Sequence, residues 1–440
     1  MDFYLNIIIL LSWFIVIFLT YFKFGIYENI FSPLNLYILI NIAGIIIFLF
    51  FLIEFKGLNY LPTYFKEPSV DMYSSLITIL LYFLSSSMVY ILLKIFNYKP
   101  LCIKGIKKLY LNKDIKIMFI FFSLFYTYIL LKSEVLHNLS YENLYKFRFE
   151  MSHGYIVFFN LFGFSMFFLV FLFLFRRLYF QKKWLILFIL LLPVWFLLIF
   201  LNNARGPFVF GTLFALSLYP HFSLISILKN FFKLRLNKKI FLFIVIIAIL
   251  LILYQEYSIH YRAQEGVFYE LVLQRIDNFI ASYIAINNNL GGFKIENIFY
   301  PFIYLIPRAI FPEKPFPPNG ELSAKIFGAN LLDDDAWSVN FGLAAESYYV
   351  SFGFLTPLYS LIIAIAIIYY SKILSKIYSK NKLDFLNFII LTSLYLTPFG
   401  IVMGGVFTPS IGNLILILLI KFIITYTKKF TNLKWRVLYV

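Results

Sequence analysis

Residues 34–53 read LNLYILINIAGIIIFLFFLI and contain no charged side chain. A helix of about 20 apolar residues is long enough to cross the ~30 Å hydrocarbon core of a bilayer. This segment therefore predicts a transmembrane helix. Similar apolar runs recur along the chain, and counting them by length predicts eleven spans in all. They lie near 4–22, 34–53, 73–93, 117–131, 155–175, 184–201, 207–228, 240–256, 349–370, 386–403 and 407–425.

The composition of the whole chain agrees with this prediction. Of 440 residues, 62% are hydrophobic and 13% are charged, and the mean hydropathy is +0.86. Soluble domains are about 45–50% apolar and about 25% charged. These values exclude a water-soluble enzyme, a disordered protein and a nucleic-acid-binding protein. The single cysteine, Cys102, excludes a disulfide framework or a thiolate metal cluster within the chain.

The charges of the connecting segments predict the orientation of the chain. One set of alternate connections holds 26 of the 38 Lys and Arg residues, whereas 18 of the 21 acidic residues fall on the other side. Because cytoplasmic connections carry the excess of Lys and Arg, we expect the N-terminus outside and the C-terminus in the cytoplasm. The first span lacks a basic flank and a cleavage site, so we expect it to be an anchor.

The spans divide the sequence into three parts. Residues 1–256 hold eight spans, 257–348 form one large external loop, and 349–440 hold the last three spans with the cytoplasmic C-terminus. Within the loop, 267–287 place apolar and polar side chains on opposite helical faces, which predicts an amphipathic helix lying at the membrane surface. The apolar stretch 298–311 is too short to cross, which predicts a re-entrant or interfacial segment.

Arginines gather on the external side, where lysine alone would not be needed for topology. A guanidinium presents paired donors to phosphate oxygens and keeps its charge when partly desolvated. This enrichment favours a bound pyrophosphate or other polyanion, with ion pairing to external acids as the alternative. Arg205 is the sharpest case, because it lies in a very short connection between two apolar spans, although it could also be a snorkelling anchor. The external arginines are Arg148, Arg205, Arg262, Arg275 and Arg308.

Other candidate residues follow from their chemistry. His260 could act as a general base or contact phosphate, and the alternative is a hydrated interfacial histidine. Lys314, like Arg308, is flanked by prolines that restrict its motion. Glu346 stands at the entrance to the ninth span, where it could orient an arginine, accept a proton or cap the helix. The acidic run 333–335 could bind a divalent cation, but such runs are usually solvated turns.

Several of these segments together resemble a known family. They are Asn-Ala-Arg-Gly at 203–206, Tyr-Arg at 261–262, Arg-x-Asp at 275–277, Ile-Pro-Arg-x-Ile-Phe-Pro-x-Lys-Pro at 306–315 and Ala-Glu-Ser-Tyr-Tyr-x-x-Phe-Gly at 345–353. In this order and on this hydropathy profile, the chain resembles bacterial O-antigen or oligosaccharide repeat-unit polymerases of the Wzy type. Two features depart from the family. Its members often have twelve or more spans with the N-terminus inside, and the Arg-x10-Gly spacing of some members is absent here.

The resemblance implies a GT-C-like membrane glycosyltransferase of the bacterial cytoplasmic (inner) membrane, with 10–14 spans. Such enzymes transfer a growing glycan from undecaprenyl pyrophosphate to an incoming lipid-linked repeat unit, building O-antigen, capsule or another exopolysaccharide. The implied partners are these lipid-linked oligosaccharides, membrane lipids and a chain-length regulator, without nucleic acid, cofactor or metal. In this scheme His260 is the catalytic base or a phosphate donor and Glu346 the alternative base. The implied substrate-binding residues are Arg205, Arg262, Arg275, Arg308 and Lys314.

Three other functions remain open at this point. An O-antigen ligase shares the large external loop and the arginines, although the Pro-Arg and Lys-Pro run favours the polymerase. A transporter or flippase would predict mid-span ionisable residues and a repeated architecture, and the sequence shows little of either. A scaffold subunit without chemistry would tolerate replacement of every external arginine.

Overall fold

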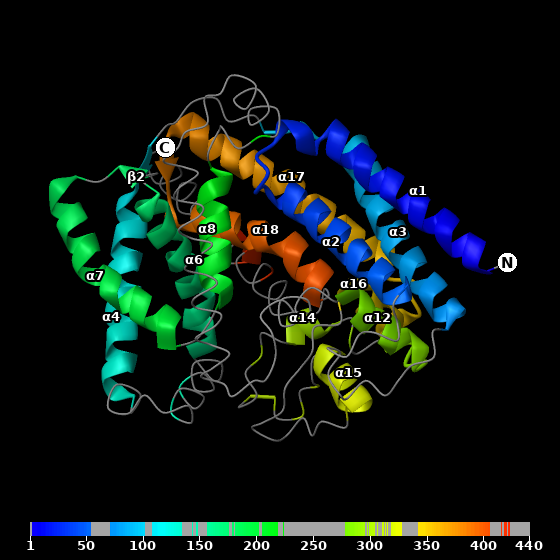
Figure 1. Ribbon diagram of the computed structural model, residues 1–440. Helices are drawn as coiled ribbons and strands as arrows, with labels where there is room; N and C mark the ends of the chain where they lie inside the picture. The colour runs from blue at the N-terminus through cyan, green and yellow to red at the C-terminus, as the bar shows by residue number, and fades with distance from the viewer. Residues whose placement is uncertain are drawn as a thin grey trace, which may run out of the picture.

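The computed structural model describes residues 2–53, 71–101, 108–133, 156–175, 178–179, 181–201, 205–218, 278–294, 299–303, 318–327 and 342–404, together with single residues elsewhere. Most of these residues are helical, and the long helices form a bundle (Figure 1). Five of the described helices are long and apolar enough to cross a membrane. The prediction of a mostly helical chain with several membrane-crossing helices is thereby confirmed in this coarse form. The five are α1 (Asp2–Lys23), α3 (Met72–Ile95), α4 (Lys113–Lys132), α17 (Thr356–Lys380) and α18 (Phe385–Gly404).

Four further apolar helices occupy predicted spans. They are α2 (Pro33–Ile53), α6 (Ile156–Leu174), α7 (Lys182–Leu201) and α8 (Arg205–Ser217). The start of α2 shows why its boundary was predictable. The Ser32 hydroxyl accepts a hydrogen bond of 3.3 Å from the Asn35 N–H, and Pro33 takes the first helical position, where its missing N–H costs nothing.

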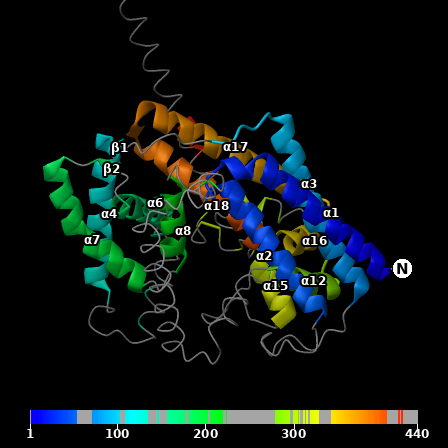
Figure 2. The same cartoon turned by 45° about the horizontal axis from the view of Figure 1, so that its top comes forward.

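The helices form two groups joined by a central pair. In Figures 1 and 2, α4, α6, α7 and α8 lie on one side and α1, α2 and α3 on the other. Between them, α17 contacts α3, while α18 contacts both α2 and α6. Each group has its own buried apolar cluster, the first around Trp195 and the second around Trp13.

Three of the segments that connect the helices pair with one another through short parallel strands. β1 (Leu109–Leu111) precedes α4, β2 (Leu178–Tyr179) precedes α7 and β3 (Lys382–Leu383) precedes α18. They form one sheet in the order β2-β1-β3. All three belong to connections that the charge pattern assigns to the basic side. The sheet therefore confirms that these connections lie at one end of the bundle.

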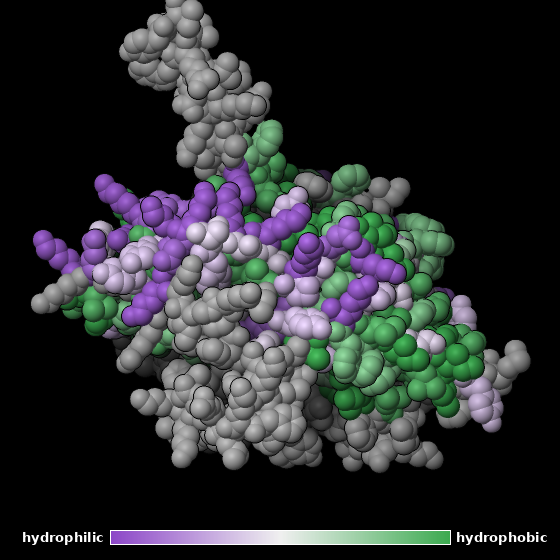
Figure 3. Space-filling model, turned by 90° about the horizontal axis from the view of Figure 1, so that it is seen from above, coloured by the Kyte–Doolittle hydropathy of each residue, from purple (hydrophilic) through white to green (hydrophobic). Residues whose placement is uncertain are grey.

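The buried carboxylate of Glu28 joins the connection after α1 to the one after α3, at the same end of the bundle as the sheet. Glu28, after the single-turn η1 (Gly25–Tyr27), accepts hydrogen bonds from the Tyr98 hydroxyl and the Leu101 N–H. The Asn29 side chain donates to the Leu216 carbonyl at 2.9 Å, just before the end of α8. We call this end the lysine-rich face, and Figure 3 shows its hydrophilic residues. Its described lysines are Lys23, Lys94, Lys99, Lys108, Lys113, Lys116, Lys183, Lys372, Lys376, Lys380 and Lys382.

Two predicted spans differ from the helices observed. The seventh was predicted at 207–228, but α8 ends at Ser217 and its following residue already lies at the lysine-rich face, where the Leu218 carbonyl accepts from Tyr378. The ninth was predicted as one helix over 349–370. Instead, the chain forms α16 (Gly342–Ser351) and then α17, with a break at Phe352 and Gly353, whose φ angles are 51° and 90°. Positive φ at two successive residues cannot continue a right-handed helix.

The helix predicted to lie at the membrane surface is instead buried where it is described. Residues 278–287 form α12 (Asn278–Asn287), and every side chain from Phe279 to Ile286 is buried. Phe279 stacks on Tyr82 of α3 with ring centroids 3.7 Å apart, and Gly44 of α2 leaves the room that this ring occupies. This part of 267–287 therefore packs inside the bundle, and the residues from 267 to 277, with most of the polar side chains, lie outside the described residues.

The elements of the predicted external loop gather opposite the lysine-rich face. Figure 1 shows α12, α14 (Tyr300–Ile303), α15 (Pro318–Phe327) and α16 in its lower half, with α12 and α16 near the lower ends of α2 and α3. The Asp71 N–H, at the start of α3, donates to the Tyr283 hydroxyl of α12 at 2.8 Å. The segment 298–311 is described as the single turn α14 with a few residues beyond it, so its re-entrant character stays a prediction.

Candidate functional site

Glu346 lies in the middle of α16, and its side chain is fully buried. Of the three roles that the sequence left open for it, capping the ninth span does not fit this position, because the chain breaks after Ser351 and places Glu346 in a separate helix. That helix contacts α3, α12, α17 and α18. Burying a carboxyl is costly unless polar groups surround it, so its neighbours decide what it can do.

One hydroxyl of α17 lies beside this carboxyl, and further hydroxyls follow along α16 and α17. The Tyr359 hydroxyl lies beside Glu346 and is itself buried. On the next residue, Ser347 shares a hydrogen bond of 2.8 Å with Thr356, which begins α17. One turn further, Ser360 donates to Ser85 of α3 at 3.2 Å. Polar side chains therefore extend from α16 into the bundle.

The polar interior continues on the far side of α3. The Trp13 indole N–H donates to the Ser86 hydroxyl at 2.9 Å, joining α1 to α3. The Tyr82 hydroxyl lies 3.2 Å from the hydroxyl of Ser282 in α12. These hydrogen bonds were not predictable, because serines scattered through an apolar span carry no periodic signal.

Tyr349 carries a second polar group on the same helix. Its hydroxyl donates a hydrogen bond of 2.7 Å to Oε2 of Glu321 in α15. The Lys294 ammonium lies 2.9 Å from the centroid of its ring, and the Lys325 ammonium lies 5.2 Å from it. Lys294 and Glu321 form an ion pair of 4.0 Å and are both partly exposed. Around the Tyr349 ring there are therefore two cations and one acid, and part of this group is exposed.

Backbone pairing explains why Lys294 meets Tyr349. Phe293 forms an antiparallel bridge with Ser351, and the Lys294 N–H donates to the Val350 carbonyl at 3.1 Å. This pairing aligns 293–294 along the end of α16. On α15, Glu321 and Lys325 are four residues apart and share one helical face.

Glu346 and Tyr349 are three residues apart on α16, so their side chains are neighbours on its surface. We call the set Glu346, Tyr349, Lys294, Glu321 and Lys325 the α16 site. It combines a buried carboxyl with a more exposed cationic cluster. Of its members, only Glu346 was a candidate from the sequence. A cation–aromatic cluster assembled from three segments has no local signature.

Of the other predicted site residues, only Arg205 is among the described residues. Arg205 is the first residue of α8, as expected from its short connection, and its backbone alone is described. The remaining predicted site residues lie outside the described residues, as does the acidic run 333–335. They are His260, Arg262, Arg275, Arg308 and Lys314.

Comparison of the chain with protein-family models, with curated proteins and with solved structures finds no match.

Proposed function

We propose that the chain is a membrane glycosyltransferase that polymerises undecaprenyl-pyrophosphate-linked oligosaccharide repeat units into a surface polysaccharide. The proposal includes about eleven spans in a GT-C-like arrangement, in the bacterial inner membrane, with the lysine-rich face toward the cytoplasm. The loop motifs from 203–206 to 345–353 support it by their resemblance to the polymerase family. The α16 site supports it independently, through the chemistry of its side chains.

The observation that carries the proposal is that a buried acid of α16, Glu346, lies three residues from Tyr349, whose ring holds two lysines of neighbouring segments. Transfer of the growing glycan forms a bond between an acceptor hydroxyl oxygen and the anomeric carbon. The bond from that carbon to the pyrophosphate oxygen breaks, and its electron pair stays on the pyrophosphate. The acceptor proton passes to a base. The reaction therefore needs cations for the leaving group and a nearby proton acceptor.

The α16 site offers both requirements. Lys294 and Lys325 add ammonium groups to the external arginines that the sequence assigns to pyrophosphate. Glu346 is a candidate for the proton acceptor, alongside His260. Because Glu346 is buried, the acceptor hydroxyl must enter this part of the bundle before it can react. The same burial excludes water, which would otherwise compete for the activated donor.

One observation favours a second function, a flippase for the same lipid-linked unit. A helix broken within the bundle and a buried ionisable residue are features of transporters. The break at Phe352 and Gly353 and the buried Glu346 fit this description. The sequence argument against a transporter, which rested on few mid-span ionisable residues, is weaker for this reason.

The test uses the full chain in nanodiscs with the lipid-linked repeat units of its host. Wild type, Glu346→Gln, Arg308→Ala and Asp384→Asn are compared by gel for a ladder of products. Asp384 is the matched acidic control, because it caps α18 at the lysine-rich face and asparagine preserves that cap. A ladder from wild type and Asp384→Asn, lost in the other two, is the expected result. Movement of the intact unit across liposomes without a ladder would overturn the polymerase and support the flippase.

A further inference from the structure

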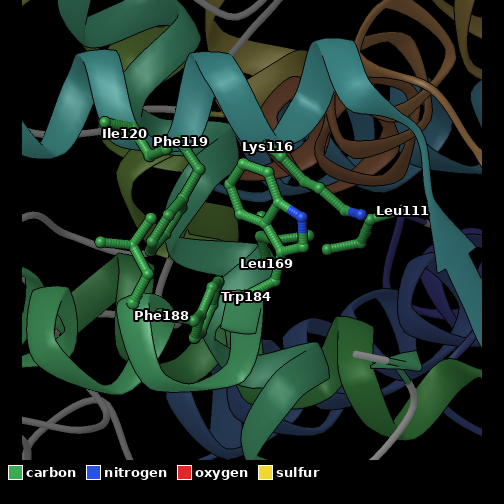
Figure 4. Close-up of a pocket in the computed structure, with 8 residues that line it drawn as sticks. Leu111, Lys116, Phe119, Ile120, Leu169, Trp184 and Phe188 are labelled. Carbon is green, nitrogen blue, oxygen red and sulfur yellow. The ribbon is translucent and has the colours of Figure 1, made fainter. Parts of the chain in front are cut away.

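A small hollow lies between α4 and α7 beside the lysine-rich face. Apolar side chains line most of it, including Phe119 from α4, Leu169 from α6 and Phe188 from α7 (Figure 4). The cavity between them is small, about 10 Å³, which is room for about one water molecule. Leu111 of β1 contributes to the wall at the end nearest the sheet. It is a shallow apolar crevice with a partly exposed rim, so a larger apolar group would lie along its mouth and not inside it.

One cation stands at this hollow. The Lys116 ammonium lies 5.0 Å from the centroid of the Trp184 ring, and both residues line the hollow. A cation at this distance from an indole is attracted to the face of the ring. Each residue belongs to the first turn or two of its helix, α4 or α7, next to the lysine-rich face. The pairing holds the ammonium at the rim of an apolar space.

The charge around the hollow is positive. Lys113 and Lys183 are exposed on the first turns of α4 and α7. The nearby acid of α4, Asp114, accepts a hydrogen bond of 3.0 Å from the Phe385 N–H, which directs it toward the start of α18. A molecule at the mouth of the hollow therefore meets lysines at one end and apolar side chains at the other.

Further from the lysine-rich face, both helices present apolar side chains outward. Leu124 on α4 and Leu190 on α7 are 60% and 68% exposed, which is expected of surface facing lipid tails. Tryptophan and lysine are the residues that favour the boundary between hydrocarbon and headgroups. The hollow thus lies where the apolar surface of the bundle meets its lysine-rich face.

We propose that an anionic phospholipid binds beside this hollow, with an acyl chain along the exposed apolar side chains of α4 and α7 and the phosphate group at Lys116. Charge and shape together select this occupant. A zwitterionic phospholipid would contact the apolar side chains equally well, but the lysines would attract it only weakly. Free phosphate would use the lysines and leave the apolar side chains uncovered. Lysines at a membrane surface each favour anionic lipid by about a fivefold change in affinity.

The test follows quenching of Trp184 fluorescence in the purified full chain by lipids with brominated acyl chains. Phosphatidylglycerol and phosphatidylcholine are titrated separately in neutral detergent. The difference between wild type and Trp184→Phe gives the signal of this tryptophan alone. We expect phosphatidylglycerol to quench at a severalfold lower concentration than phosphatidylcholine, and excess inorganic phosphate not to displace it. Equal quenching by both lipids, or full displacement by phosphate, would overturn the proposal.

A matched pair of variants separates this site from general surface charge. Lys372 lies on the same face, and its ammonium is 5.4 Å from the centroid of the Tyr369 ring, but it does not line this hollow. Lys116→Gln should remove most of the roughly fivefold preference for phosphatidylglycerol, and Lys372→Gln should retain it. Loss of the preference in both variants, or in neither, would show that the hollow does not select the lipid.

Discussion

The hydroxyl of Tyr349 donates to the carboxylate of Glu321 at 2.7 Å, and this hydrogen bond joins α16 to α15. Two lysines lie over the ring of the same tyrosine. The acid thus orients the ring without neutralising both cations. An arrangement with one spare positive charge near the outside is suited to bind an anion, and it lies one helical turn from Glu346.

The first prediction concerns the cations of the α16 site. Charge-assisted hydrogen bonds contribute about 1.5–3 kcal/mol each, so Lys294→Gln should raise the KM for the lipid-linked donor roughly tenfold or more. We expect kcat to change less, because glutamine keeps the contact with the ring. The measurement is the initial rate of polymerisation against donor concentration in nanodiscs.

Its control is Lys382→Gln, which removes one lysine from β3 at the opposite end of the bundle. That variant should leave KM and kcat unchanged. An unchanged KM in Lys294→Gln, with wild-type behaviour of the control, would remove Lys294 from the substrate-binding residues.

Much of the bundle was predictable from local sequence. An uncharged run such as 34–53 fixes both the length and the ends of α2, because apolar length and a capping serine act locally. The seventh and ninth spans were misplaced where the ends depend on tertiary contacts. Gly353, for example, lies against Leu81 of α3, and nothing near it in sequence marks that neighbour.

The candidate site was less predictable for a related reason. Glu346 was identifiable as a lone acid in an apolar context, but its burial depends on α3, α12 and α17. The burial of α12 was not predictable from the sequence, because it depends on packing against α2, α3 and α16. Lys294 and Tyr349 come together only through the bridge between Phe293 and Ser351.

The second prediction is a pH dependence of stability that arises at Glu28. Burial raises the pKa of this carboxyl above its ordinary value of 4.5, although hydrogen bonds from Tyr98, Ser32 and the Leu101 N–H act in the opposite direction. The unfolded chain then binds fewer protons than the folded chain above pH 4.5. Stability is therefore greatest below that pH and falls as the pH rises toward the folded pKa.

Glu28→Gln should remove this part of the pH dependence, because the amide does not titrate. Equilibrium unfolding in mixed micelles at a series of pH values measures the slope for both proteins. Parallel slopes for wild type and Glu28→Gln above pH 4.5 would contradict the prediction.

The third prediction concerns the break between α16 and α17. Gly353 has a φ of 90°, and an added Cβ would lie 2.6 Å from Cδ2 of Leu81. Gly353→Ala should therefore destabilise the folded chain by about 1–3 kcal/mol, from backbone strain together with this clash. Gly292→Ala is the matched control, because its added Cβ would meet nothing closer than 3.9 Å.

A second substitution separates the two causes. Because Leu81→Ala alone leaves a cavity in the core, its cost is measured in both backgrounds. Gly353→Ala should cost less in the Leu81→Ala background than in wild type, and this difference is the part due to the clash. Unfolding in mixed micelles reports both values. Equal stabilities for Gly353→Ala and Gly292→Ala would show that the chain can rearrange at this break without loss.

The fourth prediction tests the polar interior between α1 and α3. The Trp13 indole N–H donates to Ser86 at 2.9 Å, and both residues are buried. Ser86→Ala leaves this N–H without its acceptor, which should cost about 1–3 kcal/mol of stability. Trp13→Phe removes the donor and keeps an aromatic ring beside Phe279, whose centroid is 5.3 Å from that of Trp13. The double variant should be less destabilised than the sum of the two single variants, because neither partner is then left unpaired. Strict additivity in the unfolding free energies would mean that the hydrogen bond contributes nothing to holding α1 on α3.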